Sequence, residues 1–226
     1  MNEALSVARQ HAYTRSLVGL YACEAEWVAG SPQVAQPRAE EMVALSSEHG
    51  FPLFLGLGVI FRGWSLTALE QTQEGITLLA KGLSIVRATG AGIQTPLALI
   101  LLAEAHVQLG QPVEGLNFLA EAAQVMETGD ERCNEAGLHQ LRGDLLYATG
   151  NSEAAEQAYH RALAIAKQQS AKPFELRAAT SLARLWRDQG KRTEAHDVLA
   201  PVYNWFTEGF DAPVLQDAKA LLDQLA

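Results

Sequence analysis

The chain has 226 residues, of which 48% are hydrophobic, and its formal net charge is −9 at pH 7. An acidic surface repels phosphate, so this balance excludes general nucleic-acid binding. The most apolar run, at 97–103, is too short to span a bilayer, and the N-terminus lacks the apolar core of a secretory signal. Cys23 and Cys133 are far apart in the sequence, which predicts two reduced thiols in a cytoplasmic protein. From the charge and the apolar runs we expect neither nucleic acid nor a membrane as a partner.

Small or turn-forming residues recur every 40 positions along the chain. Glycines at 30, 110, 150 and 190 share this spacing, and Glu70 stands in the same series. Small side chains lie five residues after these positions and seven residues before them; they are Ala35, Gly75, Gly115, Ala155 and Ala195, and Cys23, Gly63, Ala103, Gly143 and Ala183. A period of this length predicts a solenoid, in which small residues mark the close approach of two helix backbones.

Each forty-residue unit is expected to form two antiparallel helices, because good helix formers dominate and turn signals separate the amphipathic segments. The expected units of a single domain 1–226 are about 1–50, 51–90, 91–130, 131–170 and 171–210. The expected helices are 3–28 and about 37–49, 52–69 and 73–88, 95–110 and 112–129, 133–149 and 152–169, 173–189 and 193–206. The second helix is placed near Pro37 because proline is disfavoured inside a helix.

A final amphipathic helix at 212–225 is expected to cap the last unit, since its apolar face would cover the open core surface. Four aromatic residues near the end are expected to lock the last pair to this helix: Trp186, Tyr203, Trp205 and Phe206.

The spacing resembles the tetratricopeptide repeat. In that family a small residue, a glycine between the helices, an alanine, a large apolar residue and a second alanine follow one another at set offsets. The fourth unit matches with Gly143, Gly150, Ala155, Tyr159 and Ala162. The usual unit has about 34 residues rather than 40. The resemblance implies an all-α, TPR-like right-handed superhelix of about five helix hairpins plus a C-terminal capping helix.

Longer segments resemble one bacterial family, which forms the C-terminal repeat region of large proteins with a class III adenylate/guanylate cyclase domain and an AAA-type ATPase domain. The segments are 49–76, 97–116, 175–211 and 217–226, and the resemblance runs from about Glu24 to the end. The chain has no G-x-x-x-x-G-K-[ST] loop and no paired metal-binding aspartates. The resemblance therefore implies the regulatory or scaffolding part of such a protein, without its catalytic activity.

No motif in the chain indicates a catalytic, cofactor or metal site. The histidines do not combine with other ligands at a suitable spacing, and zinc needs three or four convergent ligands. The serines lack the strand–turn–helix setting of a nucleophile elbow. We therefore expect no enzyme activity, no cofactor and no metal.

The resemblance implies that the first helix of each unit lines a concave groove. The inward positions would be Leu57, Ile60, Trp64 and Thr67 in the second unit, Leu97, Ile100, Glu104, Val107 and Gln108 in the third, Gln140, Asp144 and Tyr147 in the fourth, and Arg177, Thr180, Arg184, Arg187 and Asp188 in the fifth. The expected partner-binding residues are Trp64, Glu104, Gln140, Asp144, Tyr147, Arg177, Arg184 and Arg187. This groove would change from apolar through acidic to basic.

The arginines of the fifth unit share one helix face, since Arg177, Arg184 and Arg187 are spaced by seven and three. Guanidinium groups bind carboxylate and phosphate in a bidentate way, so the cluster suits an anionic ligand. The alternative is pairing within the chain, with Asp188, Glu175 or the acidic second helices. The family's carboxylate clamp uses lysines and asparagines that these positions lack, so a receptor for chaperone tails is not expected.

Taken together, these patterns favour a non-catalytic scaffold that recognises a protein or peptide and regulates a cyclase/ATPase-type signalling protein. Two alternatives stay open at the level of sequence. One is a sensor that binds a small anionic effector in the groove, and the other is a homodimerisation module.

Overall fold

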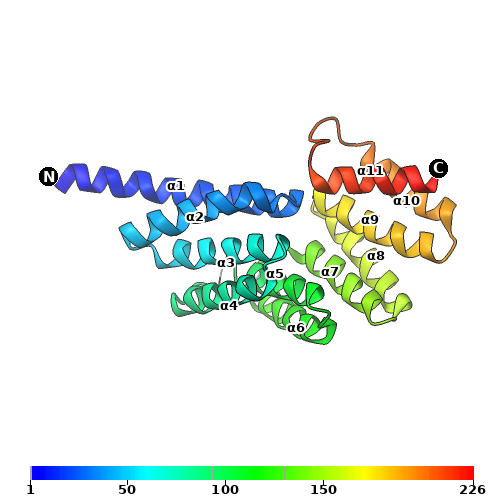
Figure 1. Cartoon of the computed structure of the whole chain (residues 1–226), viewed down its shortest axis with the longest axis horizontal. Helices are drawn as coiled ribbons and strands as arrows, with labels where there is room; N and C mark the ends of the chain where they lie inside the picture. The colour runs from blue at the N-terminus through cyan, green and yellow to red at the C-terminus, as the bar shows by residue number, and fades with distance from the viewer. Residues whose placement is uncertain (1, 93, 130) are drawn as a thin grey trace.

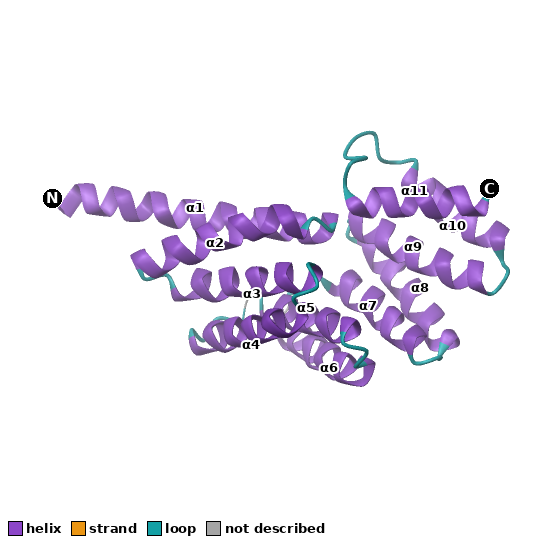
Figure 2. Cartoon of the chain, in the orientation of Figure 1, coloured by secondary structure: helices purple, strands orange, loops and turns teal. Residues whose placement is uncertain are grey.

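The protein is an array of antiparallel helices (Figure 1), seen in a computed structural model that describes residues 2–92, 94–129 and 131–226, with side chains from Gln10 onward. Helices and loops make up these described residues (Figure 2). The helices are α1 (Asn2–Ala29), α2 (Pro32–His49), α3 (Pro52–Ala68), α4 (Thr72–Ala88), α5 (Thr95–Gln108), α6 (Pro112–Gly129), α7 (Glu135–Ala148), α8 (Ser152–Gln168), α9 (Lys172–Asp188), α10 (Arg192–Tyr203) and α11 (Pro213–Leu225).

Successive helices form the hairpins that the 40-residue period predicts. Each helix packs against the next, and the first helices of the units, α1, α3, α5, α7 and α9, also contact one another in order. The last helix, α11, packs against both α9 and α10, as a sixth first helix would. Its buried residues, which include Leu215, Leu221 and Leu225, cover the end of the core as the sequence predicts. No helix in the described ranges is long and apolar enough to cross a membrane.

Helix ends recur every 20 residues. Backbone φ is positive at 30, 50, 70, 90, 110, 150, 170 and 190, while Asp130 lies outside the described residues. This left-handed conformation ends helices readily at glycine, which has no Cβ to clash. Glu70 and Ser170 adopt it with φ of 67° and 55°, although a side chain disfavours it.

Small residues bring helix backbones together inside the hairpins. A Cβ added to Gly63 on α3 would lie 2.8 Å from the carbonyl oxygen of Gly75 on α4, and one added to Gly75 would lie 2.6 Å from the carbonyl oxygen of Gly63. These distances are shorter than van der Waals contact, so no larger residue fits without moving a backbone. The prediction that small residues mark close helix packing is confirmed here.

Two expectations near the ends of the chain are wrong. The second helix begins at Pro32 rather than near Pro37, and Pro37 lies inside it on the exposed side. Pro37 cannot donate to the carbonyl of Gln33, but that exposed carbonyl is free to accept from water. Trp205 is 57% exposed and does not belong to the core, whereas Trp186, Tyr203 and Phe206 pack against it as expected.

Candidate functional site

The inner face of the array repeats in register every 40 residues. One series of equivalent positions is Glu24, Trp64, Glu104, Asp144 and Arg184; a second is Trp27, Thr67, Val107, Tyr147 and Arg187. The sequence prediction used these positions only from the second unit onward. It therefore missed Glu24 and Trp27, which the same spacing would have reached.

In the second and third units the apolar inner positions near the start and middle of each helix are part of the core, whereas Glu104 and Val107 are partly buried and Gln108 is exposed. The exposed fractions of Leu57, Ile60, Leu97 and Ile100 are 1–2%, and Trp64 is 2% exposed. The indole nitrogen of Trp64 is buried and finds no hydrogen-bond partner within the described part of the chain. This corrects the assignment of Trp64 to an accessible groove wall: the side chain fills space between helices and is closed to a partner.

In the fourth unit the inner positions form a polar cluster. The hydroxyl of Tyr159 donates to Asp144 Oδ1 at 2.8 Å, and Gln140 Nε2 donates to Asp144 Oδ2 and to Ser181 Oγ, the latter at 3.1 Å. Burial raises the pKa of Asp144, against the opposing effect of the Tyr159 hydrogen bond and of the charges on Arg177 and Arg184. The cluster links α7, α8 and α9, and its hydrogen-bonding groups are turned toward one another.

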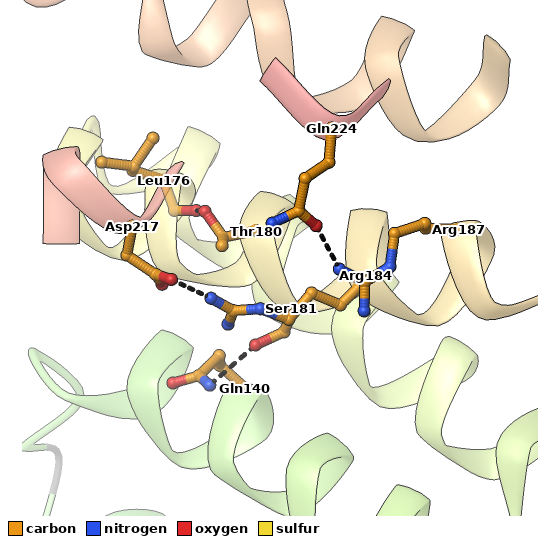
Figure 3. A network of polar contacts seen from close by, with 8 residues as sticks. All are labelled: Gln140, Leu176, Thr180, Ser181, Arg184, Arg187, Asp217 and Gln224. Atoms are coloured by element: carbon orange, nitrogen blue, oxygen red, sulfur yellow. Dashed lines mark hydrogen bonds and ion pairs between the residues drawn. The ribbon is translucent and has the colours of Figure 1, made fainter. Parts of the chain in front are cut away.

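The arginines at the end of the array are paired within the chain (Figure 3). Arg184 on α9 forms an ion pair with Asp217 on α11, and Arg187 donates from a terminal nitrogen to Gln224 Oε1 at 2.8 Å. Arg187 also donates from Nε to Asp188 Oδ1 at 2.9 Å. Of the two possibilities left open by the sequence, the structure shows intramolecular pairing, with α11 supplying partners that had not been expected.

Tyr147 contributes another link of this kind, because its hydroxyl donates to Asp188 Oδ2 at 2.8 Å across α7 and α9. The hydrogen bond to Asp188 is the main cause of a raised Tyr147 pKa. The predicted site residues of the fourth and fifth units therefore come together as a ladder between neighbouring first helices.

Trp27, at the C-terminal end of α1, joins the two halves of the array. Its indole Nε1 donates to Glu104 Oε2 on α5 at 3.0 Å, and its ring meets Phe174 on α9 edge-on, with 5.8 Å between centroids. The guanidinium of Arg177 lies 5.3 Å from the same ring centroid, a cation–π distance. Trp27 is 2% exposed. Two predicted site residues, Glu104 and Arg177, thus meet at a tryptophan that the sequence prediction had not included.

The contact between α1 and the end of the array forms a seam. Helix α1 touches α9 and α11, which lie beside its C-terminal end in Figure 1. A Cβ added to Gly30, just after α1, would lie 3.4 Å from Val214 and 3.6 Å from Pro213. The end of α1 therefore meets the start of α11 directly, although Gly30 and Val214 are far apart in the sequence.

A cavity of about 580 Å³ opens at this seam, and we call it the seam cavity. Its walls come from the C-terminal half of α1, the residues before α7, the start of α9 and the segment 206–215. Its apolar walls include Trp27, Val28, Phe174, Phe206, Val214 and Leu215. Volume and apolar lining fall in the range of sites that bind small molecules or peptide side chains.

The charged residues that line the seam cavity are Glu24 and Glu208, both acidic. Gln94 Nε2 donates to Glu24 Oε1 at 2.6 Å, and the Gln94 backbone N–H donates to Glu131 Oε2 at 2.9 Å. Burial is the main cause of a raised pKa at both Glu24 and Glu131. The negative charge of Glu131 raises the pKa of Glu24 further. The two partly buried carboxylates therefore lie close enough to repel each other.

The two thiols differ in access. Cys133 lines the seam cavity and is exposed, whereas Cys23 is fully buried. Burial raises the pKa of Cys23 to about 12 and is also the main cause of a raised pKa at Cys133. Within the described residues no three His, Cys, Asp or Glu side chains are grouped as metal ligands would be.

Comparisons with known proteins identify the fold. No protein-family model and no curated relative matches the chain. PlcR of Bacillus thuringiensis, solved in complex with the peptide PapR7 and DNA, is 12% identical and has a TM-score of 0.74, over 94% of this chain and 74% of that one. The thermophilic TPR protein TTC0263 of Thermus thermophilus is 21% identical with a TM-score of 0.61, over 92% and 99%.

A third solved structure is PH0952 of Pyrococcus horikoshii, a signal transduction ATPase with numerous domains and a tetratricopeptide repeat sensor. It is 14% identical with a TM-score of 0.55, over 92% of this chain and 33% of that one. These likenesses show that the chain has the fold of a tetratricopeptide-like helical repeat solenoid.

Proposed function

We propose that this protein is a non-catalytic recognition module that binds an apolar segment of a protein or peptide partner in the seam cavity. The observation that carries the proposal is the position of this cavity, between the first hairpin and the last helices of the array. The inner face elsewhere is either core, as at Trp64, or paired, as at Arg184. The seam cavity therefore offers an apolar wall that the chain itself does not cover.

The rim of the seam cavity favours a polypeptide ligand. Tyr21, which lines it, is 61% exposed, and Phe210, in the neighbouring loop, is 47% exposed. Exposed aromatic residues beside an apolar pocket are typical of interfaces, where they bury large area at small entropic cost. The peptide bound to PlcR, a protein of similar fold, supports the same kind of partner.

We further propose that the module acts within a cyclase/ATPase-type signalling protein. The resemblance of the segments 49–76, 97–116, 175–211 and 217–226 to that family supports this context. So does the fold likeness to the repeat sensor of an ATPase. Determining the full reading frame of the gene would test it, since a cyclase or ATPase domain in the same frame is expected.

A small anionic effector at the arginines receives less support, because Arg184 and Arg187 are already engaged by α11. The homodimerisation alternative is tested by the molecular mass in solution. A monomer that still binds peptide would favour recognition over dimerisation.

A phage-displayed heptapeptide library, selected on the immobilised chain, tests the proposed function. Ala25 is exposed and lines the seam cavity, so Ala25→Trp is expected to fill the cavity without disturbing the core. Ala120→Trp, on the exposed side of α6, is the matched control. Selected peptides should bind the native chain and Ala120→Trp but not Ala25→Trp. Equal binding to all three, or no selected peptide at all, would overturn the proposal.

Reaction of Cys133 with a bulky thiol reagent gives a second readout. A peptide in the seam cavity should slow this reaction, because Cys133 lies in the cavity wall. Cys23 is buried and contributes little to the signal.

A further inference from the structure

We infer that the segment bound in the seam cavity carries a cationic group, an ammonium or a guanidinium, next to its apolar side chains. This inference rests on the proposed function and adds the chemistry of the ligand. Glu24, which lines the cavity, would bind the cation together with Gln94 and Glu131, which adjoin Glu24 through hydrogen bonds of Gln94. The apolar walls would hold the neighbouring side chain.

The carboxylates at this place have no basic partner. Gln94 lies between them, with its amide on Glu24 and its backbone N–H on both oxygens of Glu131, at 2.9 and 3.1 Å. Among the described residues, no lysine, arginine or histidine forms an ion pair with Glu24 or Glu131. The hydrogen bonds from Gln94 offset part of the hydration that these partly buried carboxylates lose, but no counter-ion balances their charge.

The basic residues nearby are engaged elsewhere. Arg132 lies 3.5 Å from Glu135, Lys172 lies 2.6 Å from Glu175, and Arg177 lies over the Trp27 ring. The residues that line the seam cavity include no lysine or arginine. The described residues that line the cavity therefore supply negative charge and no positive charge to balance it.

A second, independent observation is the unpaired oxygen of Gln94. Its side-chain Oε1 is buried and has no hydrogen-bond partner among the residues that the structure describes, and the residue is 8% exposed. The same amide group donates through Nε2 to Glu24, so the unpaired acceptor lies beside the carboxylate. An ammonium has three donors and a guanidinium five, enough to satisfy this oxygen together with the carboxylates.

The raised pKa values of Glu24 and Glu131 agree with this arrangement. Burial disfavours the charged form of each carboxylate, and a bound cation would favour it. Binding of the cationic segment would therefore relieve an electrostatic cost that the free protein carries.

The test uses peptides selected from the same library and three single-charge variants. Glu24→Gln and Glu131→Gln each remove one carboxylate, and Glu114→Gln on α6 is a control with the same change in net charge, because Glu114 is exposed outside the cavity. Selected peptides should be enriched in lysine or arginine next to large apolar residues. Their Kd should rise roughly tenfold or more with Glu24→Gln, and rise also with Glu131→Gln, because charge-assisted hydrogen bonds are lost. Glu114→Gln should leave Kd unchanged.

The cation could come from a side chain or from a free amino terminus. Synthetic copies of a selected peptide separate the two sources: one has an acetylated N-terminus, and in another each lysine or arginine is replaced by glutamine. The copy that loses binding identifies the source. Circular dichroism of each protein variant checks that the fold is retained.

The outcomes separate this inference from the proposed function. Selected peptides could fail to bind Ala25→Trp, show no enrichment in lysine or arginine, and bind Glu24→Gln as tightly as the native chain. That result would overturn the cationic ligand but would leave the proposed recognition function intact. If no peptide distinguishes Ala25→Trp from the native chain, the proposed function fails and this inference fails with it.

Discussion

Equivalent inner positions make different contacts in the first half of the array, the second and third units, and in the second half, the fourth and fifth units. In the second and third units many of them are aliphatic or aromatic and almost fully buried, as at Ile60, Trp64 and Ile100, whereas Glu104 is polar and half-buried. In the fourth and fifth units they are polar and tied to one another, as at Asp144 and Arg184. The first half is held at these positions by apolar burial and the second by hydrogen bonds and ion pairs, although the helix geometry repeats.

This difference shows that a repeat fixes the place of a side chain but not its role. A position that faces the inside of the superhelix becomes core where neighbouring first helices carry apolar residues. It becomes a polar link where they carry complementary polar groups. Trp27 lies where the halves meet, contacting α5 through its N–H and α9 through its ring.

The largest expected effect therefore comes from Trp27→Ala, which removes the contacts that Trp27 makes with both α5 and α9. Because the side chain is buried and contacts several helices, the free energy of unfolding should fall by about 3–5 kcal/mol. Urea denaturation followed by circular dichroism measures this loss. Trp205→Ala, at a 57% exposed tryptophan, is the control and should cost much less. Equal losses would show that the seam contributes nothing special to stability.

A smaller effect on the free energy of unfolding, one that depends on pH, is expected at Asp144, the position equivalent to Trp64 in the second unit. Asp144 has a pKa raised above its ordinary value of 3.8, so its protonated form is favoured by folding. Its contribution to stability is complete below about pH 4 and is lost as pH rises through the raised pKa. Asp144→Asn removes this dependence. Gln140 Oε1, which has no partner among the described side chains, can accept a hydrogen bond from the new amide.

The measurement is the free energy of unfolding of both proteins from about pH 4 to about pH 7, the range in which a carboxyl with a raised pKa titrates. The native chain should lose stability relative to Asp144→Asn as pH rises. Trp64→Phe, two periods earlier, should shift stability by an amount that does not vary with pH, because no titrating group is changed. A constant difference between the native chain and Asp144→Asn would contradict the polar account of the second half.

The smallest expected effect tests what the halves have in common. Glu70 in the first half and Ser170 in the second both end a helix in the left-handed conformation. Replacing either by glycine removes strain but adds entropy to the unfolded chain, so each should stabilise by about 0.5–1 kcal/mol, or roughly 1–4 °C in Tm. Gly150→Ala, at φ of 81°, should destabilise and serves as the reverse control. Thermal melts that show no gain for either glycine would argue against strain at these ends.

The sequence was sufficient to predict the architecture. Spacing between small residues and turns gave the hairpins, the 40-residue register and the final helix, because these depend on local conformation and close backbone contact. Pro37 was misjudged, since its exposed place in α2 tolerates a missing hydrogen bond. Trp205 was misjudged because an aromatic side chain near a core need not enter it.

The candidate site was harder to predict, because it depends on how far the superhelix curls. Periodicity places Trp64 and Arg184 on the inner face, but it does not say which inner positions are covered. Pairing of Arg184 with Asp217 and the seam at Trp27 arise from contacts between helices distant in sequence. Extending the register into the first unit would have identified Glu24 and Trp27. The cavity between them and α9 could not be predicted, because it depends on how α1 packs against helices distant in the sequence.

The contact of α1 with α9 and α11 also affects how the whole array can change its length. A helical-repeat array whose ends do not touch can lengthen gradually, because small changes at each interface between hairpins add up. An array whose two ends are in contact can lengthen only after that contact has broken. A ligand in the seam cavity would contact both ends of the array at once, so its binding would oppose their separation.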